Sequence, residues 1–153
     1  ELLTMSPRGE EHGVVTMNLS ILFGQYVKAH NLGVMYAAET GFKLESDPDT
    51  VMAPDVAFIR RDRVGNVSRS YRSDAPDLVV EVLSPGDRKT KVEEQTSRWL
   101  SLGASAVWLV SPQTRTVDVR FADGERRLFT EEDELIGDPL VPGFRLRVSE
   151  IFA

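Results

Sequence analysis

The sequence contains no cysteine and only two histidines, His12 and His30. The lack of cysteine excludes disulfide bonds, a thiolate nucleophile and cysteine-ligated zinc or iron–sulfur centres. Two histidines are too few for a metal site built from several imidazole rings. No apolar run approaches the ~20 residues that a membrane helix needs, and no signal peptide is visible, so we expect a cytoplasmic protein. The chain begins with Glu1 instead of methionine, which is consistent with a truncated N-terminus.

The chain also has no excess of positive charge, since its net charge is −6. An acidic protein is a poor general binder of nucleic acid, because contacts to phosphates need local positive charge. The distribution is uneven, however, and 9 of the 18 lysines and arginines lie between residues 54 and 98. With 153 residues, of which 41% are apolar, we expect one domain over 1–153. Contacts to a nucleic-acid backbone are expected from the arginine-rich segment of the middle third and from the N-terminal helix.

Hydrophobic periodicity predicts an α/β fold. Helices are expected at 11–30 and 91–102, the second opened by a capping box of Thr90 and Glu93. The segment 60–76 is polar and arginine-rich and predicts a loop. The expected strands are 34–39, 41–45, 55–59, 77–83, 105–111, 116–121, 126–129 and 142–148. Because a helix separates the nearly continuous apolar strands 77–83 and 105–111, we expect a parallel βαβ crossover there, followed by a hairpin.

Glu81 lies between Val80 and Val82 in the most apolar predicted strand. Glutamate is almost never fully buried without a partner, because an unpaired buried carboxylate costs several kcal/mol or becomes protonated. One interpretation is a structural ion pair with an arginine, and the other is a metal ligand or a catalytic acid or base. Asp77 shares the same face of the strand but lies about 13 Å away, too far to bind the same ion.

Asp55 is the candidate partner of Glu81. It follows Pro54 and opens the strand 55–59, where an aspartate taken alone is an ordinary strand-start residue. If this strand neighbours 77–83, the strand spacing of ~4.8 Å brings both carboxylates within reach of one divalent cation. Oxygen ligands, with no cysteine and few histidines, favour Mg²⁺ or Mn²⁺ over zinc.

Several segments resemble one bacterial protein family. They are PDVAF (54–58), PDLVVEVLSPGDR (76–88), WLSLG (99–103), AVWLVSP (106–112), TVDV (116–119) and PGF (142–144), together with the opening TMSPRGEEHG (4–13). The family that they resemble is the Uma2 group of restriction endonucleases, a branch of the PD-(D/E)XK nuclease superfamily. The resemblance covers nearly the whole chain.

The resemblance implies a restriction-endonuclease-like core, with a mixed central β-sheet flanked by helices and a C-terminal β-hairpin extension. It also implies Mg²⁺- or Mn²⁺-dependent hydrolysis of DNA phosphodiester bonds, with Asp55 and Glu81 as metal ligands. The superfamily's lysine position two residues after the acid is Leu83 here, and the family's helical lysine position is Gln95. Glutamine carries no charge to offset a phosphate, so Lys91, one turn earlier, is the candidate substitute unless it is an exposed helix-start residue.

Other candidates each have an ordinary structural alternative. His12 and Glu39 are possible additional site residues, or else a packing histidine and a strand-end surface charge, and Asp77 is a third possible addition. The arginines of the 60–76 loop either contact a DNA backbone or belong to a solvated loop, and they are Arg60, Arg61, Arg63, Arg69 and Arg72. Nucleases that cut both strands commonly act as dimers, so we also expect a homodimer.

Two other functions remain open at this point. A catalytically weakened relative would bind nucleic acid or another protein without cleaving it, which Gln95 and the acidic net charge favour. A carboxylate-pair hydrolase acting on sugars would need no metal ion, so a chelator separates it from the nuclease.

Overall fold

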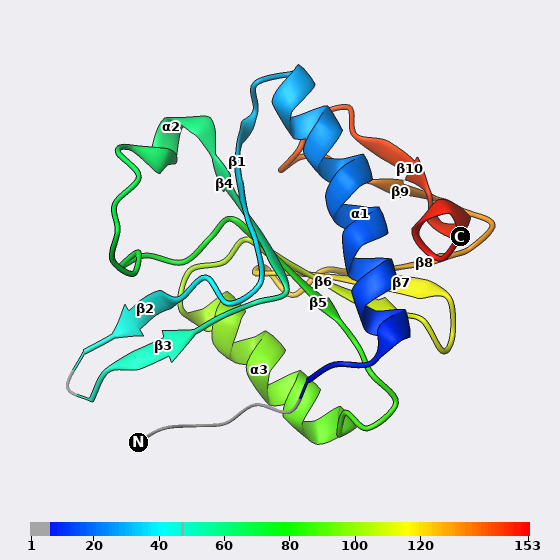
Figure 1. The fold of residues 1–153 in the computed structure, drawn as a ribbon, viewed down its shortest axis with the longest axis horizontal. Coiled ribbons are helices and arrows are strands. Elements are labelled where there is room, and N and C mark those ends of the chain that lie inside the picture. The colour runs from blue at the N-terminus through cyan, green and yellow to red at the C-terminus, as the bar shows by residue number, and fades with distance from the viewer. Residues whose placement is uncertain (1–6, 47) are drawn as a thin grey trace.

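The structure, a computed structural model, describes residues 7–46 and 48–153. A six-stranded sheet runs through its centre in the order β1-β4-β5-β6-β7-β8 (Figure 1). Only β5 and β6 are parallel, and the other neighbouring strands of this sheet are antiparallel. The strands are β1 (Gly33–Tyr36), β4 (Val56–Arg60), β5 (Leu78–Val82), β6 (Ala106–Ser111), β7 (Thr116–Phe121) and β8 (Arg126–Thr130).

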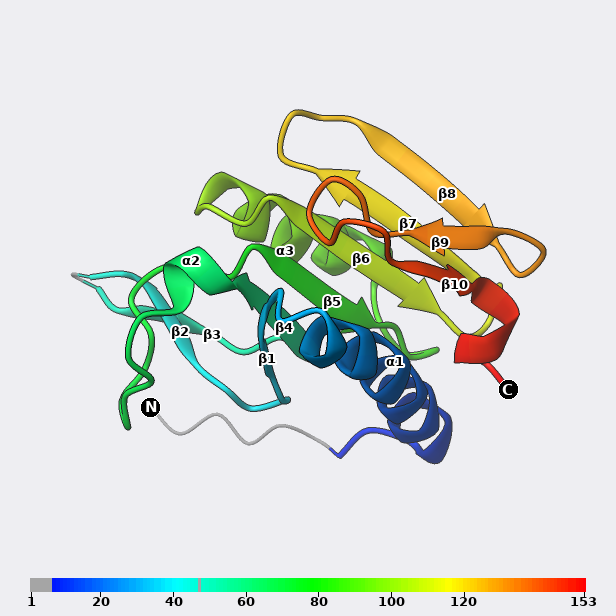
Figure 2. The same cartoon turned by 90° about the horizontal axis from the view of Figure 1, so that it is seen from above.

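Two helices cover opposite faces of the sheet (Figure 2). The long helix α1 (Glu10–Ala29) buries Val15, Leu19, Phe23 and Val27 at i, i+4, i+8 and i+12 against one face. The shorter helix α3 (Lys89–Ser101) packs Trp99 against the other face. Side chains alternate along a strand, so β5 sends one set of valines to α1 and places Val79 and Glu81 on the α3 side.

Smaller elements extend this core. The strands β2 (Phe42–Glu45) and β3 (Thr50–Met52) form one two-stranded sheet, and β9 (Glu134–Ile136) and β10 (Arg145–Arg147) form another. A short helix α2 (Arg61–Val64) follows β4, and a 3₁₀ turn η1 (Val148–Ile151) follows β10. Across the ranges that the structure describes, no helix is both long enough and apolar enough to cross a membrane.

The main predictions about the fold are confirmed. The chain is a mixed α/β protein, β5 and β6 form the parallel crossover around α3, and β7 and β8 form the expected hairpin. The C-terminal two-stranded sheet of β9 and β10 corresponds to the expected hairpin extension. Residues 4–6 of the N-terminal segment and Asp47 of the predicted turn 46–50 lie outside the described residues.

Some boundaries predicted from the sequence are wrong. The strand expected at 34–39 ends at Tyr36, because the chain turns at Glu39 with a φ of +71°. The loop predicted at 60–76 contains the short helix α2, and the strand expected at 142–148 is limited to β10, which pairs with β9 instead of closing the main sheet.

The predicted capping box is also wrong. α3 begins at Lys89, with Arg88 at the N-cap position and no side-chain cap. Glu93 does not reach back to cap the helix, because both of its carboxylate oxygens accept hydrogen bonds of 2.8 Å from Arg120 on β7. A bidentate Arg–carboxylate pair is stronger than a solvated cap contact, so the tertiary interaction overrides the local pattern.

Candidate active site

The structure brings Asp55 and Glu81 together. β4 and β5 pair antiparallel with Val56 opposite Val80, so one further step of the register places Asp55 opposite Glu81. The Asp55 N–H donates a hydrogen bond of 2.9 Å to Glu81 Oε1. Glu81 is the one partly buried residue of β5, whose other residues are buried. The prediction that the strand at 55–59 neighbours the strand at 77–83 is therefore confirmed.

Glu81 is in an unfavourable environment for an anion. Burial and then the adjacent charge of Asp55 raise the pKa of Glu81 to about 8. Among the residues that the structure describes, no lysine or arginine forms an ion pair with Asp55 or Glu81. The alternative interpretation, a buried ion pair of Glu81 with an arginine, is therefore not observed among the described residues.

Two groups hold the carboxylate of Asp55 in place. The Val82 N–H donates a hydrogen bond of 2.8 Å to Asp55 Oδ2, and His12 Nε2 lies 3.2 Å from the same oxygen. His12 is buried and comes from the first turn of α1. Residues from α1 and β5 thus meet at the carboxylate of Asp55, which directly precedes β4. A role for His12 on a substrate stays a prediction.

A second charged pair lies beside the carboxylates. Arg8 Nη1 is 3.0 Å from Asp87 Oδ1, and the Ser84 N–H donates a hydrogen bond of 2.8 Å to Asp87 Oδ2. After burial and Asp55, the charge of Arg8 lowers the pKa of Glu81 and that of Asp87 raises it. Sequence reasoning missed Arg8 and Asp87 as site residues, although both lie in segments that carry the family resemblance.

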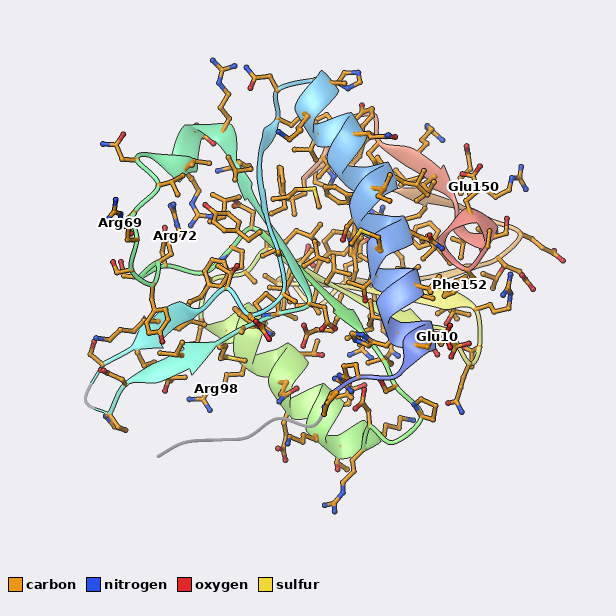
Figure 3. All side chains as sticks on the ribbon, viewed as in Figure 1. Glu10, Arg69, Arg72, Arg98, Glu150 and Phe152 are labelled. Atoms are coloured by element: carbon orange, nitrogen blue, oxygen red, sulfur yellow. The ribbon has the colours of Figure 1, made fainter. Side chains whose placement is uncertain are left out.

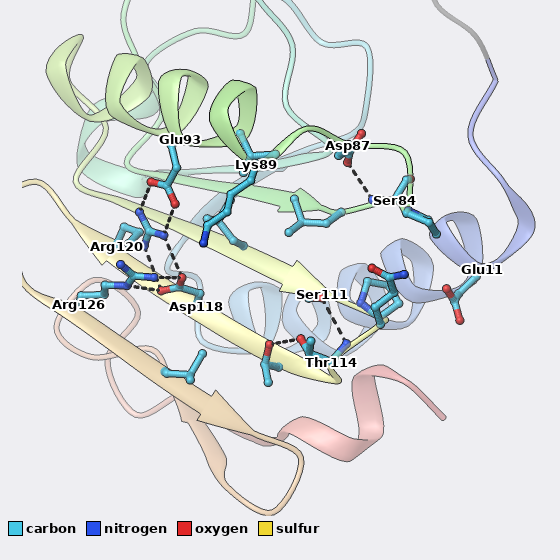
Figure 4. A pocket seen from close by; sticks show the side chains of 18 residues that line it. Glu11, Ser84, Asp87, Lys89, Glu93, Ser111, Thr114, Asp118, Arg120 and Arg126 are labelled. Carbon is cyan, nitrogen blue, oxygen red and sulfur yellow. Dashed lines mark hydrogen bonds and ion pairs between the residues drawn. The ribbon is translucent and has the colours of Figure 1, made fainter.

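An open pocket of about 310 Å³ adjoins this cluster on the α3 side of the sheet (Figure 4). Leu109, the register partner of Glu81 on β6, lines the pocket, as does Asp118, the register partner of Leu109 on β7. Lys89 extends from the start of α3 into the pocket. The hydroxyl of Ser84, also in the lining, is buried without a hydrogen-bond partner among the described residues.

The positively charged residue that sequence analysis selected on α3 is not the one that faces the sheet. Lys89, Lys91 and Gln95 are all exposed. Lys89 instead shares a stripe with the sheet-facing Val92, Thr96 and Trp99, at i+3, i+7 and i+10. That spacing is a signal in the sequence, but the predicted start of the helix at 91 left Lys89 outside it.

Asp77 lies at the opposite end of β5 and has its own partners. Its Oδ2 accepts a hydrogen bond of 2.8 Å from the Arg60 N–H, and its Oδ1 is 2.7 Å from Arg63 Nη1. Glu39 is exposed in the turn after β1. Asp77 is therefore not part of the Asp55–Glu81 cluster. The register of β1 and β4, with Tyr36 opposite Ala57, places the turn that contains Glu39 at the Asp55 end of β4, and a role for Glu39 stays a prediction.

The arginines of the 60–76 loop also lie at the far end of the sheet from Asp55 and Glu81. Asp55 precedes β4 and Arg60 ends it, and Arg69 and Arg72 lie far from Glu10, which marks the start of α1 (Figure 3). Arg63 and Arg72 form ion pairs with Asp74, and Arg60 is 3.6 Å from both Asp62 and Asp77. Contact of this loop with DNA stays a prediction. The loop lies about one strand length away from the carboxylate pair.

The chemistry of the carboxylate pair fits a hard divalent cation. A cation between two adjacent, partly buried carboxylates offsets the repulsion that raises the pKa of Glu81. In the described part of the chain no three histidine, aspartate or glutamate residues are grouped closely enough to hold a metal by themselves. Asp55 and Glu81 would therefore leave most coordination positions to water, as is usual for Mg²⁺.

Comparisons with known proteins agree with this fold and show the family. The fold, a mixed sheet with a helix on each face, is that of a protein from Anabaena variabilis described as a putative nuclease belonging to DUF820. The similarity covers 99% of this chain and 84% of that one, with a TM-score of 0.81 and 23% sequence identity. Residues 1–149 match the Uma2 family, described as "putative restriction endonuclease", and the chain belongs to this family. No curated protein sequence matches the chain.

Proposed function

We propose that the protein is a Mg²⁺- or Mn²⁺-dependent endonuclease that hydrolyses phosphodiester bonds of DNA, with Asp55 and Glu81 as the metal ligands. The carboxylate pair supports this proposal most directly, because the pKa of Glu81 is raised to about 8 and the pair has no lysine or arginine partner in the described ranges. Membership of the Uma2 family supports the same reaction class. The cytoplasmic location expected from the sequence suits a DNA substrate.

The surrounding residues prepare the pair for this role. The Val82 N–H and His12 orient the Asp55 carboxylate, and the Asp55 N–H orients Glu81. A divalent cation held there would polarise a phosphate oxygen and offset the charge that develops during hydrolysis. Arg8, whose charge acts on Glu81, supplies positive charge beside the pair, and Lys89 supplies it in the adjoining pocket, where a phosphate backbone would lie.

The test is cleavage of plasmid and oligonucleotide DNA at low salt with Mg²⁺ or Mn²⁺. We expect cleavage that EDTA abolishes and that Glu81→Ala and Asp55→Ala each reduce at least about a hundredfold. Glu132→Gln is the matched control, because Glu132 is exposed and far along the chain from the pair. Cleavage that resists EDTA, or that survives in the Glu81→Ala variant, would refute the proposal.

A second candidate is a relative that binds nucleic acid or protein without cleaving it. The specific observation in its favour is that Gln95 and Lys91 are both exposed, so neither is held at the carboxylate pair. DNA retention without cleavage, together with a Mg²⁺-dependent rise in melting temperature that Glu81→Ala removes, would favour this candidate.

A further inference from the structure

The outer face of α1 carries an apolar stripe, whereas that of α3 does not. Val14, Met17 and Ile21 are 49%, 58% and 47% exposed. The exposed residues of α3 are all polar or charged. A helix that is apolar on the side facing away from its own core normally has a second surface to pack against.

The spacing of this outer stripe is that of a helix-pairing seam. Met17 lies three residues after Val14, and Ile21 follows four residues later, so the apolar positions alternate three and four apart. Continuing the same stripe in both directions reaches Glu10 at one end, and Gly24 and Lys28 at the other. The stripe therefore has an acidic end, an apolar centre and a basic end.

From this pattern we infer that α1 pairs antiparallel with α1 of a second copy of the chain, which makes the protein a homodimer. With the twofold axis at residue 19, Ile21 of one copy meets Met17 of the other, and Val14 meets Gly24. The same register places Lys28 of each copy opposite Glu10 of the other. In the described ranges neither Glu10 nor Lys28 has an ion-pair partner in its own chain. The charge pattern thus favours a second copy over an unrelated partner.

The same arrangement has a consequence for the carboxylate pairs. His12, which touches Asp55, lies seven residues from residue 19, or about 10 Å along the helix. The dimer therefore places the two His12 residues about 21 Å apart along the paired helices. The two candidate active sites lie at opposite ends of one shared surface. The pairing itself depends only on α1 and stands whether or not the protein cleaves DNA.

Sedimentation equilibrium tests the pairing across a range of protein concentration. We expect the mass of a dimer for the wild type, and the mass of a monomer for Met17→Glu and for Ile21→Glu. Val67→Glu is the matched control, because Val67 is 73% exposed on the loop before β5 and should leave the dimer intact. Circular dichroism melts of each variant separate loss of pairing from loss of folding.

Charge reversal tests the antiparallel register. Lys28→Glu alone and Glu10→Lys alone should each raise the dimer dissociation constant about tenfold, because a twofold dimer contains the pair twice. The double variant Glu10→Lys/Lys28→Glu should restore the wild-type value. A wild type that is monomeric at about 1 mM, a dimer insensitive to Met17→Glu, or a double variant weaker than either single one would overturn the inference.

Discussion

The two ends of β4 and β5 hold acidic residues in opposite surroundings. At one end, Asp77 is buried and its carboxylate contacts Arg63 and Arg60. At the other, Asp55 and Glu81 face each other, and their hydrogen-bond partners among residues 7–46 and 48–153 are only His12 and main-chain N–H groups. The same dipeptide, Pro-Asp, precedes the strand that starts at each end, as Pro54-Asp55 before β4 and Pro76-Asp77 before β5. The dipeptide alone therefore does not distinguish the two ends.

The difference lies in how the charge is compensated. Burial alone would raise the pKa of Asp74 in the arginine cluster, yet hydrogen bonds from Arg72 and Arg63 lower it below its usual value. Burial and Asp55 instead raise the pKa of Glu81 to about 8. Carboxylates that are paired with arginines stabilise the fold. Carboxylates without a cationic partner cost stability and retain affinity for a cation from solution. Four predictions test this contrast, in decreasing order of expected effect.

Glu81→Gln should change the pH dependence of stability most. The pKa of Glu81 is raised from 4.5 to about 8, so the wild type loses stability as pH rises through that window. The loss is at most ~1.4 kcal/mol per pH unit, and we expect about 3 kcal/mol in total. Urea unfolding in the presence of a chelator should give equal stabilities at pH 5 and a more stable variant at pH 9. Parallel profiles would show that Glu81 is not under electrostatic strain.

Arg63→Ala should have the next largest effect, at the compensated end. Asp77, whose side chain is 5% exposed, would lose its closest cation. We expect the free energy of unfolding to fall by about 3 kcal/mol at neutral pH. Arg69→Ala is the control, since Arg69 is exposed in the same loop and should change stability by less than about 0.5 kcal/mol. Equal effects of the two variants would contradict the structural role of the Arg63–Asp77 pair.

The sequence predicts the carboxylate pair because its signals are strong and local. The strands 77–83 and 105–111 are nearly continuous apolar runs, and a carboxylate inside such a run is conspicuous. One assumption, that the strand opened by Asp55 is the neighbour, then suffices to place both carboxylates together, and the register of β4 and β5 agrees with it.

The partners of those carboxylates are not predictable in the same way. Arg63 compensates Asp77 across 14 positions of sequence, and Arg120 takes Glu93 away from the helix cap across 27. Which partner a long side chain contacts depends on the packed tertiary structure, and the periodicity of the sequence does not predict it. Lys89 differs from these residues, because its helical spacing from Val92 and Trp99 is visible in the sequence. Assigning it to the sheet-facing side of α3 requires the correct start of the helix.

Binding of Mg²⁺ to the carboxylate pair should change the stability of the protein by less than the two substitutions above. Below pH 8 a cation has to displace the proton of Glu81, so affinity should fall by up to about tenfold for each pH unit. We expect Mg²⁺ to stabilise the protein by about 1–2 kcal/mol at pH 8.5 and by close to zero at pH 6. Thermal melts with and without Mg²⁺ measure this difference. The Glu81→Gln variant should show no Mg²⁺ effect at either pH, and an unchanged effect in that variant would place the cation elsewhere.

The smallest expected effects are on DNA affinity, and they decide which end of the sheet faces the substrate. Arg8→Ala removes positive charge beside the carboxylate pair and Lys89→Ala removes it from the adjoining pocket, so each should weaken DNA binding a few-fold at low salt and reduce its salt dependence. Arg61→Ala and Arg69→Ala remove the same charge at the opposite end and should change binding less than about twofold. Fluorescence anisotropy of a labelled duplex, measured in Ca²⁺ to limit cleavage, compares the four variants at matched ionic strength. If the loop variants weaken binding more than the other two, the arginine-rich end holds the DNA backbone, and the substrate has to extend along the full length of β4 to reach Asp55 and Glu81.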